Sequence, residues 1–388
     1  MSELSYMEKL LNGVEVKWMP LAEVCRFING RAYKQEELLS KGKYPVLRVG
    51  NFFTNQNWYY SDLELDQDKY CDKGDLLYAW SASFGPRIWE GGKSIYHYHI
   101  WKVVPNLNVI CKEFLYYLLQ WDTKALKDTH STGSTMVHIS KASIEKRLVP
   151  LPCPENPEKS LAIQSEIVRI LDKFTALTAE LTAELTMRKK QYNYYRDQLL
   201  SFKEGEVEWK TLGEVAVIGT GNHDTQDAIE HGKYIFYARG REPLKLNVFD
   251  FDETAIITAG DGAGVGKVFH YAKGKYALHQ RAYRIVPNAF MNPRFVYHYI
   301  TAYFFTYIQK ASVSSSVTSL RRPMFLKFPI PVPPSEEQAR IVEILDKFDT
   351  LTNSITEGLP REIELRQKQY EYYRDLLFSF PKPETVSN

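Results

Sequence analysis

The sequence has little cysteine and no long apolar segment. Its 388 residues include only four cysteines, Cys25, Cys71, Cys111 and Cys153, which lie far apart and form no Cys-x-x-Cys pair. This spacing argues against a disulfide framework or a zinc site and favours buried or idle thiols in a reducing compartment. No apolar run approaches the roughly 20 residues of a membrane helix, and the N-terminus lacks the pattern of a secretory signal. We therefore expect a cytoplasmic protein without a membrane partner.

Net charge is also small, but it is unevenly distributed. The formal net charge is +2. Residues 17–150 hold 18 Lys or Arg and 14 Asp or Glu, and residues 210–330 hold 15 and 9, so the rest of the chain is net acidic. Two basic segments flanked by acidic ones indicate where a polyanion would bind.

Motifs of nucleotide and metal chemistry are missing or incomplete. GDGAGVGK at Gly260–Lys267 resembles a phosphate-binding loop, but Asp261 stands at the first required glycine and Val268 at the Ser or Thr position. We expect a glycine-rich turn after a strand instead. His97 and His99 share one face of a predicted strand without further ligands, which favours structural histidines.

A second partial motif is NPRF at Asn292–Phe295. It carries Arg294 where the amino-methyltransferase motif has proline, so we expect it to open a helix near Pro293. The sequence therefore predicts no catalytic residue, no metal site and no cofactor bound by this chain.

An internal repeat is the strongest signal present. GVEVKWMPLAEV from Gly13 matches GEVEWKTLGEV from Gly205. QSEIVRILDKFTALT from Gln164 matches QARIVEILDKFDTLT from Gln338, and QYNYYRDQLLSF, which begins at residue 191, matches QYEYYRDLLFSF, which begins at residue 369. The repeat also sets His97 opposite His279. The helical parts agree almost residue for residue while the intervening segments diverge, so we infer two copies of one unit.

The matched parts have the 3-4 apolar spacing of a coiled-coil seam, which predicts helices over residues 164–202 and 336–380. Their similar lengths suit an antiparallel pair. Gly358 and Pro360 predict a kink in the second helix, and Ser335 with Gln338 fits a capping box at its start.

The tandem tetrad TAEL-TAEL runs from Thr178 to Leu185. One tetrad changes the helix length by about 6 Å and keeps the seam roughly in phase. This favours a spacer role, and a generic helix-favouring repeat is the alternative.

The segments between the helices are each expected to be an α+β module. Strands are predicted near residues 44–50, 75–80 and 97–104 with a helix over 112–126, and near 233–240, 254–260 and 283–286 with a helix over 292–309. The predicted fold class is α+β, with two pseudo-symmetric α+β modules separated by two long antiparallel coiled-coil helices. The expected divisions are an N-terminal segment packing near the C-terminal helix (1–16), a first module (17–155), a central helix (156–204), a second module (205–334) and a C-terminal helix (335–388).

Loops of both modules carry side chains suited to DNA. Arg and Lys bind guanine edges or phosphates, Asn binds adenine, and Ser and Thr bind phosphate. A single loop arginine is more often only solvated, so each residue is a candidate. The candidates are Arg31, Tyr33, Lys34, Arg48, Asn51, Ser131, Thr132, Ser134, Thr135, Thr220, Asn222, His223, Arg239, Arg241, Ser314, Ser315, Ser316, Arg321 and Arg322.

The whole chain resembles the specificity subunit of type I restriction-modification systems, in the subgroup with TAEL tetrads in the central helix. The resemblance is carried by VPLP at Val149–Pro152, IPVPPSEEQ at Ile330–Gln338, the two IVxILDKF helix starts, the two QYxYYRD endings and the tetrads. It implies that each module is a target recognition domain for one half of a bipartite site in double-stranded DNA.

The resemblance also implies partners. Two modification subunits would dock on the helices, which set the spacing, and restriction subunits would join the full complex. S-adenosylmethionine, ATP and Mg would then be bound by these partners. The docking candidates are Ile167, Leu171, Phe174, Tyr192, Tyr195, Ile341, Leu345, Phe348, Tyr370 and Tyr373.

Two other functions stay open at this point. A stand-alone DNA adenine methyltransferase or nuclease would need a methyl-donor or metal-carboxylate site. A coiled-coil scaffold without a DNA role would show no salt-dependent DNA binding.

Overall fold

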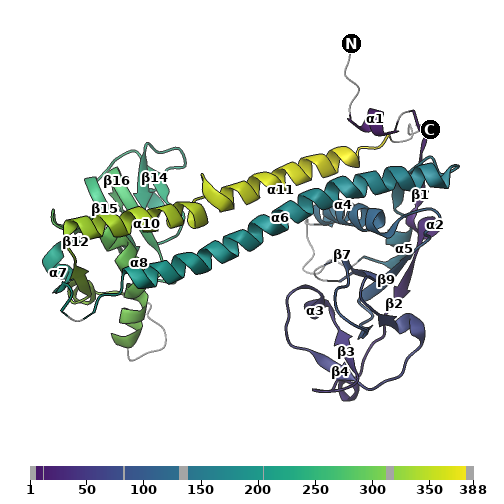
Figure 1. The fold of residues 1–388 in the computed structure, drawn as a ribbon, viewed down its shortest axis with the longest axis horizontal. Helices are drawn as coiled ribbons and strands as arrows, with labels where there is room; N and C mark the ends of the chain where they lie inside the picture. The colour runs from purple at the N-terminus through teal and green to yellow at the C-terminus, as the bar shows by residue number, and fades with distance from the viewer. Residues whose placement is uncertain are drawn as a thin grey trace, which may run out of the picture. The chain divides into compact units, whose positions relative to one another are not determined.

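The computed structural model describes residues 6–11, 13–81, 84–130, 139–203, 205–311 and 319–381. The chain forms two compact units (Figure 1). Unit 1 comprises Met1–Glu180 and Glu364–Asn388, and unit 2 comprises Leu181–Ile363. Both units combine helices with β-sheets, which confirms the α+β class.

The described residues of unit 1 form three β-sheets, with strand orders β2-β9-β6-β7, β4-β3-β8-β5 and β1-β10. The strands are β1 (Val16–Pro20), β2 (Cys25–Asn29), β3 (Tyr44–Leu47), β4 (Tyr59–Ser61), β5 (Tyr70–Cys71), β6 (Leu76–Ala79), β7 (Gly85–Ile88), β8 (Ser94–Tyr96), β9 (Ile100–Pro105) and β10 (Leu148–Pro152). The helices are α1 (Tyr6–Leu11), α2 (Leu21–Val24), η1 (Gln35–Glu37), α3 (Val49–Phe53), η2 (Gln67–Lys69), α4 (Lys112–His130), α5 (Lys141–Glu145) and the first part of α6 (Pro157–Leu199).

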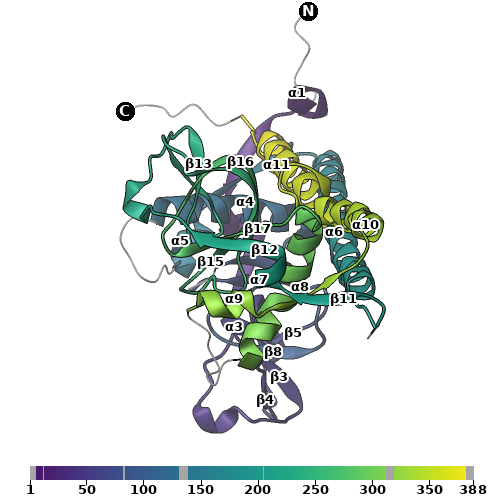
Figure 2. The same ribbon diagram turned by 90° about the vertical axis from the view of Figure 1, so that its left-hand side faces the viewer.

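Unit 2 contains a six-stranded sheet of order β12-β17-β15-β16-β13-β14 and the pair β11-β18 (Figure 2). The strands are β11 (Glu208–Thr211), β12 (Ala216–Thr220), β13 (Tyr234–Tyr237), β14 (Leu244–Leu246), β15 (Phe251–Ala259), β16 (Phe269–Leu278), β17 (Ala282–Pro287) and β18 (Pro329–Val332). The helices are α7 (Leu212–Val215), η3 (Thr225–Asp227), α8 (Pro293–Ala311), α9 (Arg322–Leu326), α10 (Ser335–Asn353) and the beginning of α11 (Gly358–Leu377), besides the last part of α6.

The predicted strands and helices are present, with shifted ends. The strand expected over 44–50 stops at Leu47, because Val49–Phe53 turns into α3. The strand expected over 97–104 begins only at Ile100, since His97–His99 forms a turn. Gly260–Lys267 is the turn between β15 and β16, and Pro293 opens α8, both as expected.

The two units differ in where their strands are interrupted. In unit 2, β15 pairs with β16 from Phe251 to Thr258. In unit 1, a turn in which Asp75 donates its N–H to the Asp72 carbonyl (3.0 Å) separates β5 from β6. The long hairpin of unit 2 therefore corresponds to shorter strands shared by two sheets in unit 1.

Each unit has its main core between its sheets and its helices. In unit 1, Ile167 and Leu171 of α6 are fully buried with α4 residues, and Leu11 shares this core with Leu377 and Phe378. In unit 2, Ile341 and Leu345 of α10 are buried in the equivalent way. This burial is what holds the first turns of each repeated helix to its own module.

A buried glutamine joins each helix to the module before it. Gln164 Oε1 accepts from Cys111 N–H (2.9 Å), and Gln164 Nε2 donates to the Val109 carbonyl (2.9 Å). Gln338 Oε1 accepts from Asn292 N–H (2.6 Å) in the same way. The predicted capping box is therefore wrong, because the Gln338 side chain binds the module instead of the helix end.

The C-terminal segment 335–388 is not one continuous helix. It is broken between α10 and α11, next to the predicted kink at Gly358 and Pro360. Gly358 has φ +79°, and a Cβ there would lie 2.3 Å from the Thr350 carbonyl oxygen. The second copy is also longer, since Tyr370 follows Phe348 by 22 positions and Tyr192 follows Phe174 by 18. Four residues, Ser354–Glu357, are the non-helical ones.

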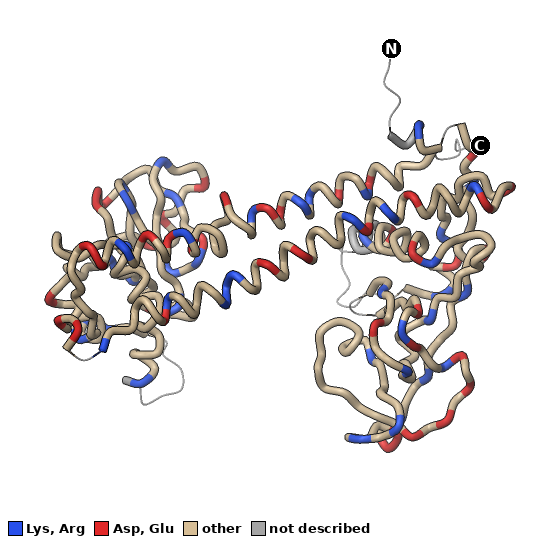
Figure 3. The backbone as a smooth tube through the Cα atoms, in the orientation of Figure 1, with Lys and Arg blue, Asp and Glu red and all other residues tan. Residues whose placement is uncertain are grey.

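Equivalent aromatic pairs join the repeated helices within each unit. Phe174 of α6 stacks with Tyr373 of α11 in unit 1, with ring centroids 5.2 Å apart. Phe348 of α10 stacks with Tyr195 of α6 in unit 2, at 5.6 Å. Figure 3 shows acidic and basic residues interspersed along these helices. Within the described ranges, no helix is both long enough and apolar enough to cross a membrane.

Candidate nucleic-acid interface

A glycine follows β2 in unit 1 and β12 in unit 2, and each of the two lies very close to a neighbouring strand. A Cβ on Gly30 would lie 2.2 Å from the Tyr96 carbonyl oxygen, and a Cβ on Gly221 would lie 1.8 Å from that of Leu278. Only glycine fits at such a distance. The chain therefore enters the next loop along the same path in both units.

In unit 1 the following residues are held by backbone hydrogen bonds. Arg31 N–H donates to the Tyr96 carbonyl (3.0 Å), and Trp80 N–H donates to that of His99 (3.0 Å). The His97 ring accepts the His99 N–H at Nδ1 (3.4 Å). The turn is thus closed by a histidine side chain.

Unit 2 repeats this arrangement. His223 N–H donates to the Leu278 carbonyl (3.3 Å), and Gly260 N–H donates to that of Arg281 (2.8 Å). The His279 ring accepts the Arg281 N–H at Nδ1 (2.9 Å). The predicted correspondence of His97 with His279 is confirmed.

We call these segments the loop frame. It consists of Arg31, Trp80 and His97–His99 in unit 1, and of His223, Gly260 and His279–Arg281 in unit 2. The backbone of the loop frame is shared, but its side chains are not. Unit 1 places an aromatic side chain, Trp80, where unit 2 has Gly260.

Aromatic rings dominate the loop frame of unit 1. Trp80 and His99 meet edge to face with centroids 4.8 Å apart, and Tyr98 lies 4.0 Å from His99. Burial first, and then the charges of His99 and Arg48, lower the pKa of His97 to about 4. Its ring is therefore neutral at pH 7, and with Nδ1 accepting, Nε2 carries the proton.

A hollow of about 160 Å³ lies beside this loop frame. It is lined by Arg48, Val49, Gly50, Asn51, Asn55, His97 and His99. Two of the predicted DNA-binding residues, Arg48 and Asn51, thus come together with the two histidines. The Asn51 amide donates to the Asn55 and Asn57 carbonyls (3.0 and 2.8 Å), which fixes its orientation.

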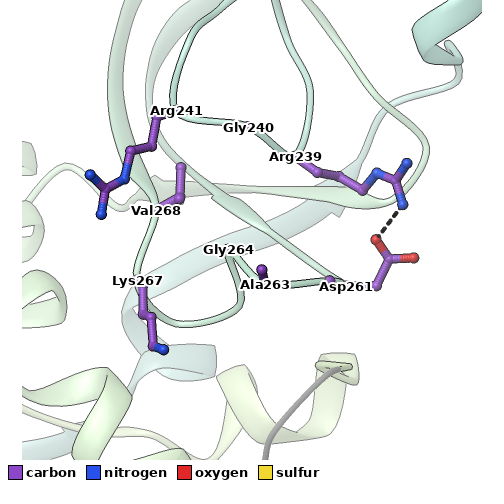
Figure 4. Close-up of a pocket in the computed structure, with 9 residues that line it drawn as sticks. Arg239, Gly240, Arg241, Asp261, Ala263, Gly264, Lys267 and Val268 are labelled. Atoms are coloured by element: carbon purple, nitrogen blue, oxygen red, sulfur yellow. Dashed lines mark hydrogen bonds and ion pairs between the residues drawn. The ribbon is translucent and has the colours of Figure 1, made fainter. Parts of the chain in front are cut away.

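Unit 2 has a larger and more basic hollow of about 510 Å³, drawn in Figure 4. It is lined by Arg239, Gly240, Arg241, Asp261, Gly262, Ala263, Gly264, Lys267 and Val268. Arg239 turns toward Asp261, whereas Arg241 and Lys267 lie on the other side (Figure 4). A smaller hollow of about 270 Å³ also reaches Asp261 and contains Thr220 and Arg281.

Asp261 binds two arginines. Arg239 Nη1 donates to Oδ1 (2.9 Å) and Arg281 Nη1 donates to Oδ2 (3.0 Å). Burial alone would raise the pKa of Asp261, but the hydrogen bonds and positive charges of both arginines outweigh it and lower this pKa. Asp261 is therefore ionised at neutral pH.

Other predicted DNA-binding residues of unit 1 are engaged within the module. Both outer nitrogens of Arg31 bind the Glu37 carboxylate (3.0 and 2.7 Å). The Tyr33 ring lies half-buried against His97, and Lys34 is exposed at the start of η1. These residues shape the loop rather than line the hollow.

In unit 2, His223 is also bound internally. Its Nε2 lies 3.0 Å from Asp250 Oδ1. Asn222 is exposed in the same loop, and Arg321 and Arg322 are exposed at the start of α9. The predicted residues Ser131, Thr132, Ser134, Thr135, Ser314, Ser315 and Ser316 lie outside the described residues.

The predicted docking residues fall into two groups. Ile167, Leu171, Ile341 and Leu345 are fully buried in the cores of their own units, so their side chains offer no surface to a partner. The others lie on exposed or partly exposed helix faces: Phe174, Tyr192, Tyr195, Phe348, Tyr370 and Tyr373. Tyr195 and Tyr373, which occupy equivalent positions of the repeat, are 45% and 41% exposed.

Asp261, Arg281 and Lys267 line the hollows of unit 2 but are not among the residues predicted from the sequence. In the sequence, Asp261 stands only as a departure from the phosphate-loop motif. Arg281 could have been found from the repeat, because it lies two residues after His279 as His99 lies two after His97.

The cysteine thiols are buried or half-buried. All four thiols are free, and burial, with a smaller effect of Glu145, raises the pKa of Cys25 to about 12. Among the described residues, no group of three or more His, Cys, Asp or Glu side chains could hold a metal ion.

Residues 13–187 and 204–365 match the family described as "Type I restriction modification DNA specificity domain". The chain is 42% identical over 422 residues to the type I restriction enzyme EcoR124I/EcoR124II specificity subunit of Escherichia coli, covering 100% of both chains. It is 38% identical over 395 residues to the EcoprrI specificity subunit of Escherichia coli, covering 92% of this chain and 93% of that one.

Solved structures share the fold. The S subunit of a type I restriction-modification system from M. genitalium has a TM-score of 0.61 and 16% identity, covering 96% of this chain and 98% of that one. A chain from a study of complex assembly in the type I R-M system has a TM-score of 0.55 and 15% identity, covering 94% and 97%.

Proposed function

The chain belongs to the family of type I restriction-modification DNA specificity subunits, and from this premise we propose how its two units divide the recognition of DNA. The family's role is DNA sequence recognition. Each unit reads one half of a bipartite double-stranded site, through the hollow beside its loop frame. The observation that carries this proposal is one backbone frame occurring twice with different side chains.

The two hollows suit different bases. In unit 1, Arg48 lines the hollow together with Asn51 and the neutral His97. The Asn51 amide hydrogens are bound to the Asn55 and Asn57 carbonyls, so Asn51 Oδ1 is the atom that can accept from a base. In unit 2, arginines surround the hollow, and arginine pairs well with guanine. Basic residues outside the hollows, such as Arg321 and Arg322, would bind phosphates and set the position of the duplex.

The chain is proposed to be a non-catalytic subunit that acts in the cytoplasm. Two modification subunits would bind its helices, and restriction subunits would complete the complex. S-adenosylmethionine, ATP and Mg would be bound by those partners. Tyr195 and Tyr373 support a paired docking surface, because the repeat presents the same half-exposed ring twice. The TAEL tetrads would belong to the spacer between the half-sites.

The test is methylation of a randomised duplex library by the chain in complex with its modification subunits and labelled S-adenosylmethionine. We expect a two-part consensus with an unread spacer and binding that weakens steeply with salt. Asn51→Ala should change the consensus in one half only, and Arg241→Ala in the other half only. Methyl transfer by the chain alone would contradict the non-catalytic assignment and favour a stand-alone methyltransferase. Salt-independent binding without a consensus would instead favour a scaffold.

A further inference from the structure

Arg239 and Arg281 differ from the other paired arginines of the chain. They reach Asp261 from separate segments, one just after β13 and one in the turn after β16. They share a single carboxylate, and each uses only Nη1 to bind it. Within the described part of the chain, no other side-chain hydrogen bond of either guanidinium is found.

Structural arginines in the same protein are bound more completely. Arg31 gives both outer nitrogens to Glu37. Arg294 gives Nε and Nη2 to Asp346, adds Asp349, and is only 22% exposed. Arg239 and Arg281 are 41% and 63% exposed, so the donors that do not bind Asp261 are open to a ligand.

The carboxylate between them is itself held in place. Asp261 forms an antiparallel bridge with Ser319, and the Gly260 carbonyl accepts from Leu320 N–H (2.7 Å). A Cβ on Gly260 would lie 2.6 Å from the Arg281 carbonyl oxygen. The backbone segments around the carboxylate are therefore in close contact, and the two guanidinium groups are preoriented.

Unit 1 lacks this arrangement at equivalent positions. The Leu47 carbonyl accepts the N–H of His97 (2.9 Å), and the Tyr237 carbonyl accepts the N–H of His279 (3.0 Å). Leu47 therefore corresponds to Tyr237, and Val49, two residues further on, corresponds to Arg239. His99 aligns with Arg281, and Ser81, after Trp80, aligns with Asp261. Among the described residues, this arginine pair is therefore found in unit 2 and not at the equivalent positions of unit 1.

We propose that Arg239 and Arg281, held by Asp261, read guanine in the half-site recognised by unit 2. This inference rests on the proposed function. Guanine presents two acceptors, O6 and N7, in the major groove, and a guanidinium fork matches them. The adjacent Asp261 carboxylate repels a fully charged phosphate oxygen more strongly than the partial charges of O6 and N7, which favours base contact over backbone contact.

The variants Arg239→Gln, Arg281→Gln and Asp261→Asn test this in the complex with modification subunits, by the same library methylation. The wild-type consensus should contain guanine in one half-site. Each arginine variant should reduce guanine preference at one position by roughly 5- to 150-fold, with a gain for adenine, because glutamine pairs with adenine. Asp261→Asn should reduce the preference for guanine in that half-site only.

Arg340→Gln is the matched control, because Arg340 is exposed on α10 and pairs with Glu337 there. It should leave the consensus unchanged. A uniform loss of binding without a change of base preference would overturn the inference and indicate phosphate contacts. A half-site without guanine would overturn it as well.

A wild-type complex without any two-part consensus would instead refute the proposed function. Thermal unfolding of each complex shows whether a variant has folded. If Asp261→Asn does not assemble, Arg281→Gln decides, because this exposed side chain can be changed without disturbing a core.

Discussion

Replacing Gly221 by alanine should open the loop frame of unit 2. The added Cβ would lie 1.8 Å from the Leu278 carbonyl oxygen and 2.3 Å from its carbonyl carbon. Real Cβ contacts are essentially never below 3.0 Å, so these backbone atoms must separate by more than 1 Å. The hydrogen bonds from Gly221 N–H to the His279 carbonyl (3.3 Å) and from His223 N–H to the Leu278 carbonyl (3.3 Å) would be stretched or lost.

The expected cost can be set against known magnitudes. Overpacking costs about 1–3 kcal/mol. Each lost hydrogen bond adds about 1 kcal/mol. Because two hydrogen bonds are affected, we expect Gly221→Ala to lower the free energy of unfolding by about 3–5 kcal/mol. Hydrogen exchange should also become faster in peptides covering Leu278 and His279.

Gly92→Ala is the matched control, because nothing lies within 4 Å of a Cβ there. Urea unfolding, followed by fluorescence, and hydrogen-exchange mass spectrometry measure the two effects. In the complex, Gly221→Ala should also lose the preference for the unit 2 half-site. Wild-type stability and exchange in Gly221→Ala would refute the reasoning, since the frame would then not depend on this close approach.

Three further changes have defined outcomes. The pKa of His97 is lowered to about 4, so below pH 6.5 the unfolded chain binds a proton at this residue that the folded chain does not bind. The stability that His97 contributes is therefore present above pH 6.5 and is lost as the pH falls toward 4. His97→Gln should make the free energy of unfolding less dependent on pH in this range, as measured by unfolding at several pH values. Gln338→Ala leaves Asn292 N–H without its acceptor and should cost ~1–3 kcal/mol by urea unfolding, whereas exposed Gln369→Ala should cost little. Tyr195→Ala should weaken binding of a modification subunit by about tenfold in a titration, and equal affinity would remove this ring from the docking surface.

The order of modules and helices along the chain could be predicted, because it depends on apolar spacing and repeated segments in the sequence. The apolar spacing after Gln164 and Gln338 specifies helices whose first turns are buried, and the glycine at 358 marks the break. The alternation of strands and one helix in each module was also sufficient for the α+β class. In contrast, the capping box at Ser335 failed, because the burial of Gln338 against its module overrode a local signal.

The loop candidates were predicted less well, because residue type does not tell where a side chain points. Arg31 and Arg239 are both loop arginines in the sequence, yet one is closed on Glu37 and the other opens into a hollow. Asp261 looked like a defect in a phosphate loop, and the fold makes it the partner of two arginines.

The sequence by itself determined that the chain is a duplicated α+β protein with matched helices and diverged modules. Apolar spacing and repeated segments can be recognised from the order of the residues alone, without knowing which residues are in contact. Only the tertiary structure decided which side chains meet. The loop frame is assembled by hydrogen bonds between segments some 20 to 65 residues apart, such as Trp80 with His99 and Arg31 with Tyr96. Gly30 and Gly221 are required because a neighbouring strand lies too close for a Cβ, and not because of the conformation of their own turns. A close approach of this kind can be recognised only in the tertiary structure.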